Sequence, residues 1–406
     1  MKSIRYAWRN LWRNKKRTHI TLTALAFATA ILIVSSSLLD GIMEDAVDNM
    51  TSISVGEVQV HAPGYLDDRS FYKSIVNPEG IIRAVEALPA FPAPRSYGHG
   101  LISYENRSSG SRFWGIDPAA EKKAFALAPN MQEGVFLPEG PEKKVVLGRR
   151  LAQFLRADVG AEVVVVVQAA DGSLGNDLYT VSGILKPSGS LIDRTAAIIH
   201  QEDFAGLFVS GGRIHEIAFN SKGNIPADQL KEAIRASAQN ADVKTWGELL
   251  PVFSDLLNIT QATLWLFSSI FFLVAGLGIM NTMLMAAYER TWEFGIMKAL
   301  GTSPRLIIGI VLIEAAILSS LAALAGAGIG SAVSICLNNF GIDVSVFARE
   351  LRVSDIIFNP VWRPELSVRN VVFPVFCIWT ICLAASFYPA FLAARQEPVI
   401  SMHGNY

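Results

Sequence analysis

AAYERTWEFGIMKALGTSPR, residues 286–305, is a short charged segment between two long apolar runs. A segment in such a place is ordinarily the turn between two membrane crossings. Here charged side chains recur at helical spacing: Glu289, Arg290, Glu293 and Lys298. Apolar side chains form a ridge beside them: Phe294, Ile296, Met297 and Leu300. Gly301 follows at the position of a helix C-cap and Pro304 comes three residues later, so the pattern predicts a short amphipathic helix.

Two interpretations of this helix remain open. It can dock into a groove on a soluble partner, as amphipathic helices do, or it can only cover lipid headgroups at the membrane surface. The first is favoured, because no motif elsewhere in the chain supplies an energy source.

The composition predicts a mixed membrane and soluble architecture. Of 406 residues, 51% are hydrophobic and 17% charged, and the mean hydropathy is +0.34. This is too apolar for an ordinary soluble enzyme and too charged for a protein made only of membrane helices. A net charge of −1 argues against nucleic-acid binding. The three cysteines, Cys336, Cys377 and Cys382, lie in apolar runs and are expected to be small buried hydrophobic residues.

Four apolar stretches are long enough to cross a membrane as helices. The third carries one acid, Glu314, and the fourth contains Pro374 and Pro389. Residues 1–17 hold seven basic residues and no acid, so both termini are expected on the cytoplasmic side. The first span is too long for a signal peptide and lacks a cleavage site, which predicts a retained anchor.

These patterns divide the chain into segments. We expect an amphipathic interfacial helix at 1–18, spans at 19–42, 256–287, 306–338 and 371–394, and an extracytoplasmic α/β domain at 43–255. We also expect the cytoplasmic coupling helix at 288–305, an external loop at 339–370 and a cytoplasmic tail at 395–406. The α/β domain has strand patterns at 53–61, 161–168, 178–185 and 196–200 and helix patterns at 148–156 and 227–239. Tracts rich in Pro and Gly at 91–100 and 133–141 suggest loops. Apolar residues from Trp246 to Leu257 suggest a short helix that leads into the second span.

Small residues recur every four positions in the third span: Ala322, Gly326, Gly330 and Ser334. Such a stripe lets two helices approach closely in lipid. It fits packing within the chain and a dimer contact equally well. Glu314, the one acid inside a span, is expected to reach the interface or to pair with a basic residue near the coupling segment.

The motifs of several enzyme classes are missing from the sequence. It contains no P-loop and no nucleophile elbow. His215–Glu216 begins like a zinc-protease motif, but Phe219 occupies the position of the second histidine. We therefore expect no catalytic residue, no metal site and no cofactor in this chain.

Two motifs resemble a known family. The segment ERTWEFGIMKALGTSPR after the second span and YPAFLAARQEPV near the C-terminus, together with one span, a large external domain and three more spans, resemble permeases of the MacB/FtsX/LolC–LolE family of bacterial ABC transporters. EVQVHAPGY at 57–65 and TWGELLP at 245–251 are most similar to its lipoprotein-releasing branch.

The resemblance implies an inner-membrane permease, identical or homologous to a second permease, on two copies of an ABC ATPase that binds ATP and Mg. Its coupling helix would contact the ATPase through Tyr288, Glu289, Arg290, Glu293, Phe294, Ile296, Met297, Leu300 and Gly301. The external domain would have a porter-like α/β part and a β-rich part.

The substrate would be a lipoprotein, passed to a periplasmic carrier, with acyl chains held between the first two spans. Bulky residues there are candidate lining groups, although for any single one contact with lipid or a neighbouring helix is favoured: Phe27, Leu32, Leu264, Phe267, Phe271 and Leu273. Two alternatives are a mechanical scaffold that regulates a periplasmic enzyme and a MacB-like exporter of an amphiphilic small molecule or peptide.

Overall fold

The structure is a computed structural model, and it describes residues 2–238, 240–344, 352–353, 356–357 and 360–395. The residues form two compact units. We call Glu44–Leu256 the α/β domain; the described residues within 348–359 group with it. We call the described residues of 1–43, 257–347 and 360–406, which carry the long helices, the membrane domain. Residues 396–406, with the end of the C-terminal motif and most of the expected tail, lie outside the described part, as does the side chain of Ile4.

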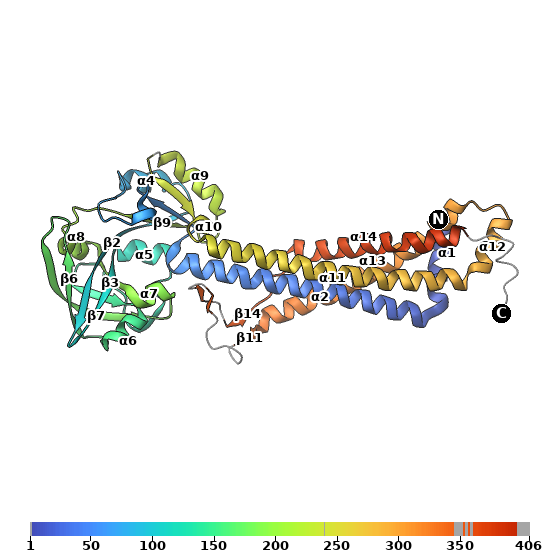
Figure 1. The fold of residues 1–406 in the computed structure, drawn as a ribbon, viewed down its shortest axis with the longest axis horizontal. Helices are drawn as coiled ribbons and strands as arrows, with labels where there is room; N and C mark the ends of the chain where they lie inside the picture. The colour runs from blue at the N-terminus through green and yellow to red at the C-terminus, as the bar shows by residue number, and fades with distance from the viewer. Residues whose placement is uncertain (1, 239, 345–351, 354–355, 358–359, 396–406) are drawn as a thin grey trace. The chain divides into compact units, whose positions relative to one another are not determined.

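The membrane domain contains the four expected spanning helices, which confirms the fold class (Figure 1). These are α2 (Lys15–Met50), α11 (Pro251–Glu289), α13 (Pro304–Phe340) and α14 (Val368–Arg395). An N-terminal helix α1 (Lys2–Leu11) joins α2 through a 3₁₀ turn, Trp12–Asn14, and a short helix α12 (Thr291–Ala299) separates α11 from α13. In the described part of the 339–370 loop, β11 (Ile342–Asp343) pairs with β14 (Val361–Trp362), and β12 (Arg352–Val353) with β13 (Ile356–Ile357).

Side chains from all four long helices meet in one apolar core. It contains Leu25 and Leu32 of α2, and Ile279, Leu318 and Ile378 of the other three helices. The two prolines Pro374 and Pro389 lie inside α14 and are buried. Prolines are tolerated in membrane helices because packed neighbours satisfy the freed backbone groups. Cys382 is buried as expected, but Cys336 is exposed in this chain, so that part of the cysteine prediction is wrong.

The stripe of small residues packs within the chain. Ala322, Gly326, Gly330 and Ser334 are all buried. A Cβ at Gly326 would lie 2.5 Å from the Ala26 oxygen, and one at Gly330 would lie 3.0 Å from the Ala30 Cα. The backbones of α13 and α2 therefore touch along this stripe, which corrects the alternative that it forms a dimer contact.

The α/β domain is built on a ten-stranded sheet that closes partly on itself. In chain order the strands are β1 (Val58–His61), β2 (Phe91–Tyr104), β3 (Arg107–Ile116), β4 (Met131–Gly134), β5 (Lys144–Leu147), β6 (Glu162–Gln168), β7 (Leu174–Leu185), β8 (Ala196–His200), β9 (Glu216–Asn220) and β10 (Asp242–Thr245). Six of them pair in a closed circuit, β2–β3–β8–β5–β7–β6 and back to β2, with β3–β8 and β5–β7 parallel. This ring is the β-rich part of the domain.

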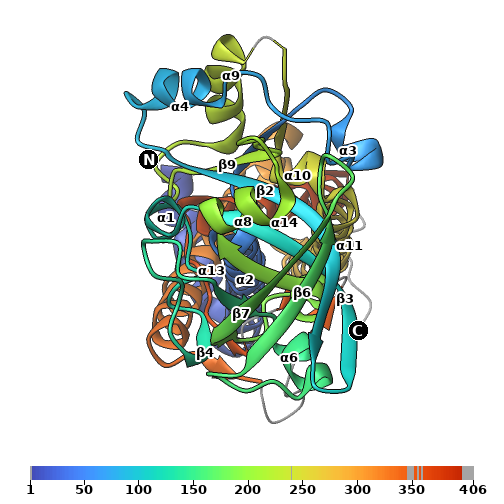
Figure 2. The same cartoon turned by 90° about the vertical axis from the view of Figure 1, so that its left-hand side faces the viewer.

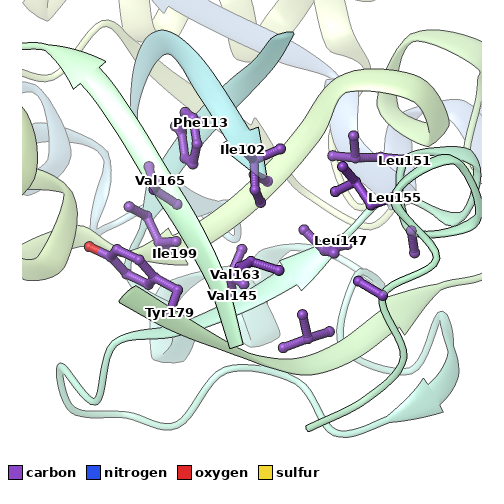
Figure 3. Packing of buried hydrophobic residues seen from close by; sticks show 14 of the residues in the cluster. Ile102, Phe113, Val145, Leu147, Leu151, Leu155, Val163, Val165, Tyr179 and Ile199 are labelled. Atoms are coloured by element: carbon purple, nitrogen blue, oxygen red, sulfur yellow. The ribbon is translucent and has the colours of Figure 1, made fainter. Parts of the chain in front are cut away.

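Alternating residues fill the interior of the ring. Val163 and Val165 of β6 are fully buried, whereas Val164 between them is 43% exposed, as expected for a strand with one face inward. They pack with Ile102, Phe113 and Tyr179 (Figure 3). Helix α8 (Gln201–Phe208) closes the ring so tightly that a Cβ at Gly98 would lie 2.3 Å from the Phe208 ring. Glycine is therefore required where α8 crosses β2.

Three of the four strands outside the ring, β1, β9 and β10, belong to a second, α/β part of the domain. The order β10–β1–β9–β2 continues the sheet beyond the ring. Helices α4 (Pro78–Val85) and α9 (Ala227–Ser237) lie side by side on it, away from β4 and α6 (Arg149–Leu155) at the other end of the domain (Figure 2). Ile81 and Val85 of α4 pack with Leu230 and Ile234 of α9. Short helices α3 (Tyr65–Asp68), α5 (Pro118–Ala124), α7 (Ser190–Thr195) and α10 (Trp246–Leu249) complete the domain.

Two of the strand and loop predictions for this domain are wrong. Residues 53–55 belong to a π-helical turn, Thr51–Val55, at the end of α2, and the strand begins only at Val58. The Pro-rich tract 91–100 is strand β2, not a loop. Pro92 and Pro94 pair with β9 alone, because pairing with β3 starts at Arg95. Proline is tolerated there because one side of the strand needs no N–H donor.

The helix expected from Trp246 to Leu257 is two helices. α10 ends at Leu249, and α11 starts at Pro251. Leu250 between them has φ −125° and ψ 65°, because proline excludes the helical region for the residue before it.

The N-cap of α5 provides a small-effect prediction. The Asp117 carboxylate accepts a hydrogen bond from the Ala119 N–H at 2.8 Å. Asp117→Ala should cost about 1 kcal/mol, measured as faster amide hydrogen exchange in residues 118–124 of the full chain. Asp117→Asn, which retains a capping oxygen, is the matched control and should exchange nearly as slowly as the parent; equal effects of the two changes would contradict the capping role.

Candidate coupling site

Helix α12 ends at Gly301 as the sequence predicts, but it begins only at Thr291, because α11 continues through Glu289. Arg290, with φ −111° and ψ 14°, breaks the helical path between α11 and α12. At the other end Gly301 has φ +88°. Its N–H donates to the Lys298 oxygen at 2.9 Å, and the Thr302 N–H donates to the Met297 oxygen at 2.9 Å. This is the Schellman motif, in which glycine adopts the left-handed conformation without strain.

One apolar side of α12 faces its own chain. Phe294 is fully buried and packs with Ile307 and Val311 of α13 and with Ala390 and Ala393 of α14. This corrects the expectation that Phe294 belongs to a ridge offered to a partner, because its side chain fixes α12 to the membrane domain instead. Ile296 and Met297 are partly buried.

Arg290 and Glu314 form a buried ion pair next to this core. One guanidinium nitrogen of Arg290, Nη1, donates to both carboxylate oxygens of Glu314, at 2.8 and 2.9 Å. Both side chains are 5% exposed. Burial alone would lower the pKa of the Arg290 guanidinium, but the Glu314 charge and its hydrogen bonds raise that pKa overall. The structure thus confirms that Glu314 pairs with a basic residue of the coupling segment, and it places Arg290 inside rather than on the surface.

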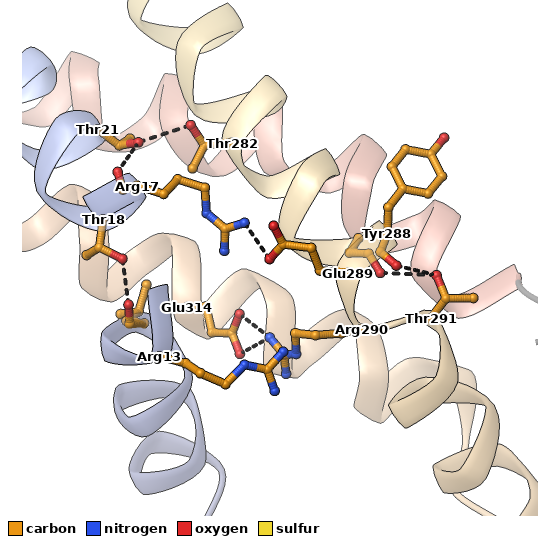
Figure 4. Close-up of polar contacts among 12 residues, drawn as sticks. Arg13, Arg17, Thr18, Thr21, Thr282, Tyr288, Glu289, Arg290, Thr291 and Glu314 are labelled. Atoms are coloured by element: carbon orange, nitrogen blue, oxygen red, sulfur yellow. Dashed lines mark hydrogen bonds and ion pairs between the residues drawn. The ribbon is translucent and has the colours of Figure 1, made fainter. Parts of the chain in front are cut away.

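The N-terminal segment reaches the same site by three contacts. The Asn10 amide donates to Glu314 Oε1 at 2.8 Å, and Arg17 donates to Glu289 at 2.8 Å. Arg13 pairs with Glu293, which also accepts from Arg290 Nε at 3.3 Å. Figure 4 shows the Arg17–Glu289 and Arg290–Glu314 pairs between the first spanning helix, the end of α11 and α13. The N-terminal segment is therefore linked to the beginning of the coupling segment, at Glu289 and Glu293, and to Glu314 of α13.

A second apolar surface on the coupling segment has no cover in the described chain. Tyr288 and Trp292 are each 60% exposed, and Leu300 is 81% exposed. We call these three residues the open face. Trp292 was not among the predicted contact residues, although it is as exposed as Tyr288, which was. Arg13 and Arg17 were also missed, since their partners lie more than 270 residues away.

The six candidate substrate-lining residues do not form one surface in this chain. Leu32 is 5% exposed and packs inside the helix core, so it is not available to line a cavity. By contrast Phe27, Phe267, Phe271 and Leu273 are 41–67% exposed, and Leu264 is half-buried. Much of the apolar surface of α11 is thus uncovered by its own chain.

Comparisons with known proteins agree with this architecture. The family model described as MacB-like periplasmic core domain matches residues 18–237, which is more than half of the chain. The model described as FtsX-like permease C-terminal matches residues 265–398. The chain belongs to the MacB/FtsX/LolC family of ABC transporter permeases. The first match covers the α/β domain and the second the last three spans with the coupling segment, so this permease has a periplasmic-type domain between its first two membrane helices.

Individual relatives match nearly the whole permease. The lipoprotein-releasing system transmembrane protein LolC of Neisseria meningitidis is 23% identical, over 94% of this chain and 92% of that protein. The macrolide export ATP-binding/permease protein MacB of Wolinella succinogenes is 24% identical over 98% of this chain, but the chain spans only 60% of that protein. Among solved structures, the periplasmic region of MacB from Actinobacillus actinomycetemcomitans matches with a TM-score of 0.38, at 13% identity over 52% of this chain and 97% of that one.

Proposed function

We propose that this permease extracts lipoproteins from the bacterial inner membrane and passes them to a periplasmic carrier, driven by two copies of a separate ATPase that hold ATP and Mg. Both termini and α12 face the cytoplasm, and the α/β domain faces the periplasm. The permease pairs with a second, identical or homologous permease, and this chain itself contributes no catalytic group.

The observation that carries the proposal is the coupling site. The open face supplies apolar surface to a soluble partner, while Phe294 and the Arg290–Glu314 pair hold α12 firmly on α13 and α14. Force applied to the open face is therefore transmitted to the membrane helices. The Arg17–Glu289 pair extends the link to α2.

The spans suit an amphiphilic cargo. Outside Glu314, the middle of the spans lacks ionisable residues that would line a hydrophilic pore. Transferring acyl chains out of a bilayer costs about 0.8 kcal/mol per CH₂, so extraction needs an external energy source. The match to LolC over nearly the whole of both chains supports a lipoprotein as the cargo.

Efflux of an amphiphilic molecule is the second candidate, because MacB proteins match at similar identity. The scaffold role remains a third possibility within the family. Purification of the complex in mild detergent, followed by mass spectrometry, separates the three: a lipidated protein, a small amphiphile or a periplasmic hydrolase would be recovered with the permease. Recovery of a hydrolase without any amphiphile would contradict the transport proposal.

Replacing the open face should weaken ATPase binding. Glu289 and Glu293 are less informative targets because each already pairs with an arginine of this chain. Leu300→Ala and Trp292→Ala each remove a side chain whose burial by a partner contributes about 1.5–3 kcal/mol, so we expect at least about a tenfold loss of ATPase affinity. The measurement is titration of detergent-solubilised permease with the purified ATPase.

The matched control is Leu324→Ala. Leu324 is 69% exposed on α13, within a spanning helix, and its truncation should leave ATPase affinity unchanged. Unaltered affinity in both Leu300→Ala and Trp292→Ala would overturn the assignment of the open face.

A further inference from the structure

The α/β domain contains a cavity of about 660 Å³, within the size range of small-molecule sites. Every lining residue belongs to this one domain, from Asn49 to Phe253. One part of the cavity wall is apolar and includes Met50, Ile53, Leu66, Leu250 and Phe253. The other part carries charged side chains.

The charged part of the wall is cationic. Four basic side chains, Arg69, Arg95, Arg112 and Lys244, face the cavity with only two carboxylates, Glu216 and Glu248. Both carboxylates are already engaged. Glu216 accepts from Arg95 at 3.0 Å and from the Tyr97 hydroxyl at 2.9 Å, and Glu248 pairs with Lys231 at 2.7 Å.

Only one of the four basic side chains is paired with carboxylates: Arg95 contacts Glu121 at 2.6 Å and also Glu216. Among the residues that the structure describes, Arg69, Arg112 and Lys244 form no ion pair with a carboxylate; Arg112 lies over the Tyr97 ring, 3.8 Å from its centre. The two histidines of this region add little positive charge, since burial lowers the pKa of both His61 and His215.

Two buried N–H donors in this wall lack acceptors. Trp114 is 6% exposed, and its indole Nε1 has no hydrogen-bond partner in the described chain. The Nε of Arg112 is likewise buried and unpartnered. The Arg112 guanidinium carbon lies 5.8 Å from the centre of the Trp114 ring. Buried polar groups are nearly always hydrogen-bonded, and a site that offers two free donors and excess positive charge favours an anionic acceptor.

We propose that this cavity binds an amphiphile with an anionic head group, with the head accepting hydrogen bonds from Trp114 and Arg112 and the apolar part lying against Met50, Ile53 and Leu250. The site is additional to the extraction proposed above, since the bound amphiphile need not be the cargo. An anionic membrane lipid and an anionic soluble amphiphile share this chemistry.

Photoaffinity labelling of the full chain in nanodiscs of zwitterionic lipid tests the site. The probe is dodecyl phosphate with a diazirine in its chain, and the comparison is the corresponding dodecanol. We expect dodecyl phosphate to label peptides containing Met50, Ile53 or Leu250 about tenfold more strongly than the alcohol, because charge-assisted hydrogen bonds distinguish the two. Equal labelling by the two probes, or displacement by inorganic phosphate alone at equal concentration, would overturn the proposal.

Variants locate the head group. Arg112→Gln should reduce labelling by dodecyl phosphate about tenfold and leave labelling by dodecanol unchanged, whereas Arg107→Gln, on the same strand but outside the cavity, should change neither. Undiminished labelling of Arg112→Gln would refute the site. Binding of the ATPase, which tests the coupling site independently, should be normal in both variants, so failure here is distinguishable from failure of the proposed function.

The same labelling in nanodiscs that contain phosphatidylglycerol distinguishes an anionic membrane lipid from an anionic soluble amphiphile as the bound molecule. Protection of the site by this lipid would support the anionic amphiphile as a membrane lipid. If phosphatidylglycerol left the labelling by dodecyl phosphate unchanged and Arg112→Gln reduced it, the bound molecule would be an anionic amphiphile from outside the bilayer.

Discussion

Arg290→Ala should destabilise the membrane domain by about 3–5 kcal/mol, because it leaves the Glu314 carboxylate buried without its counter-ion. The carboxylate would retain only the hydrogen bond from Asn10. Glu314→Ala should also destabilise the domain, but by less, because Arg290 keeps its pair with Glu293 at 3.3 Å. Unfolding of the purified permease in mixed detergent micelles, followed by tryptophan fluorescence, measures both effects.

A double variant and a surface pair provide the controls. Arg290→Met with Glu314→Leu removes both charges and should be far less destabilised than either alanine variant, since no unpaired charge remains. Arg13→Ala breaks the pair with Glu293, whose side chains are 50% and 32% exposed, and should cost no more than about 1 kcal/mol. If the double variant lost as much stability as the sum of Arg290→Met and Glu314→Leu measured singly, the pair would have no coupling energy and the assignment would be refuted.

The same variants test whether the Arg290–Glu314 pair transmits motion from the ATPase to the membrane helices. Because Arg290 lies at the junction of α11 and α12 and Glu314 lies on α13, the pair joins three segments that must move together if the ATPase drives the membrane helices. We therefore expect the Arg290→Ala complex to hydrolyse ATP while the proposed transport falls. This phenotype differs from that of Leu300→Ala, which acts before the coupling site by weakening ATPase binding.

The sequence predicted the elements of the coupling site better than their orientation. The Gly301 cap follows from local chemistry, which a sequence displays directly, whereas the break at Arg290 before Thr291 was not predicted. The direction in which each apolar residue points does not, because α12 has two apolar sides, one with Phe294 and one with Trp292. Helical periodicity cannot say which side meets the chain itself and which is left for a partner. The arginine contacts of the N-terminal segment were missed for a similar reason, since charge pairing over such separations has no sequence signature.

In the α/β domain, predictions from local sequence patterns were wrong where contacts with residues distant in the sequence decide the structure. The strand at 196–200 was predicted with its observed bounds because five residues of it are buried on both sides in the sheet. The alternation at 53–55 favoured a strand but lies at the end of a helix that continues from α2. The pairing of the Pro-rich tract with β9 depends on an edge that only the assembled sheet creates.

Gly326→Leu should destabilise the membrane domain by roughly 3 kcal/mol or more, at the upper end of the cost of overpacking. The added Cβ alone would lie 2.5 Å from the Ala26 oxygen and 2.6 Å from the Thr29 Cβ. A backbone oxygen inside a helix cannot move aside as a flexible side chain can, so α2 and α13 must separate. The expected result is a lower unfolding midpoint in detergent and loss of the core that includes Leu25 and Ala322.

Gly328 provides the matched control on the same helix. A Cβ there would meet nothing within 4 Å, and the residue is exposed in this chain. Gly328→Leu has the same change in volume, hydrophobicity and helix propensity as Gly326→Leu, so any difference in stability between the variants reports the contact with α2. If the stripe instead held two permeases together, Gly326→Leu would dissociate the complex without lowering the stability of the single chain. Equal stability of the two variants would therefore refute packing within the chain and return the stripe to the dimer interface.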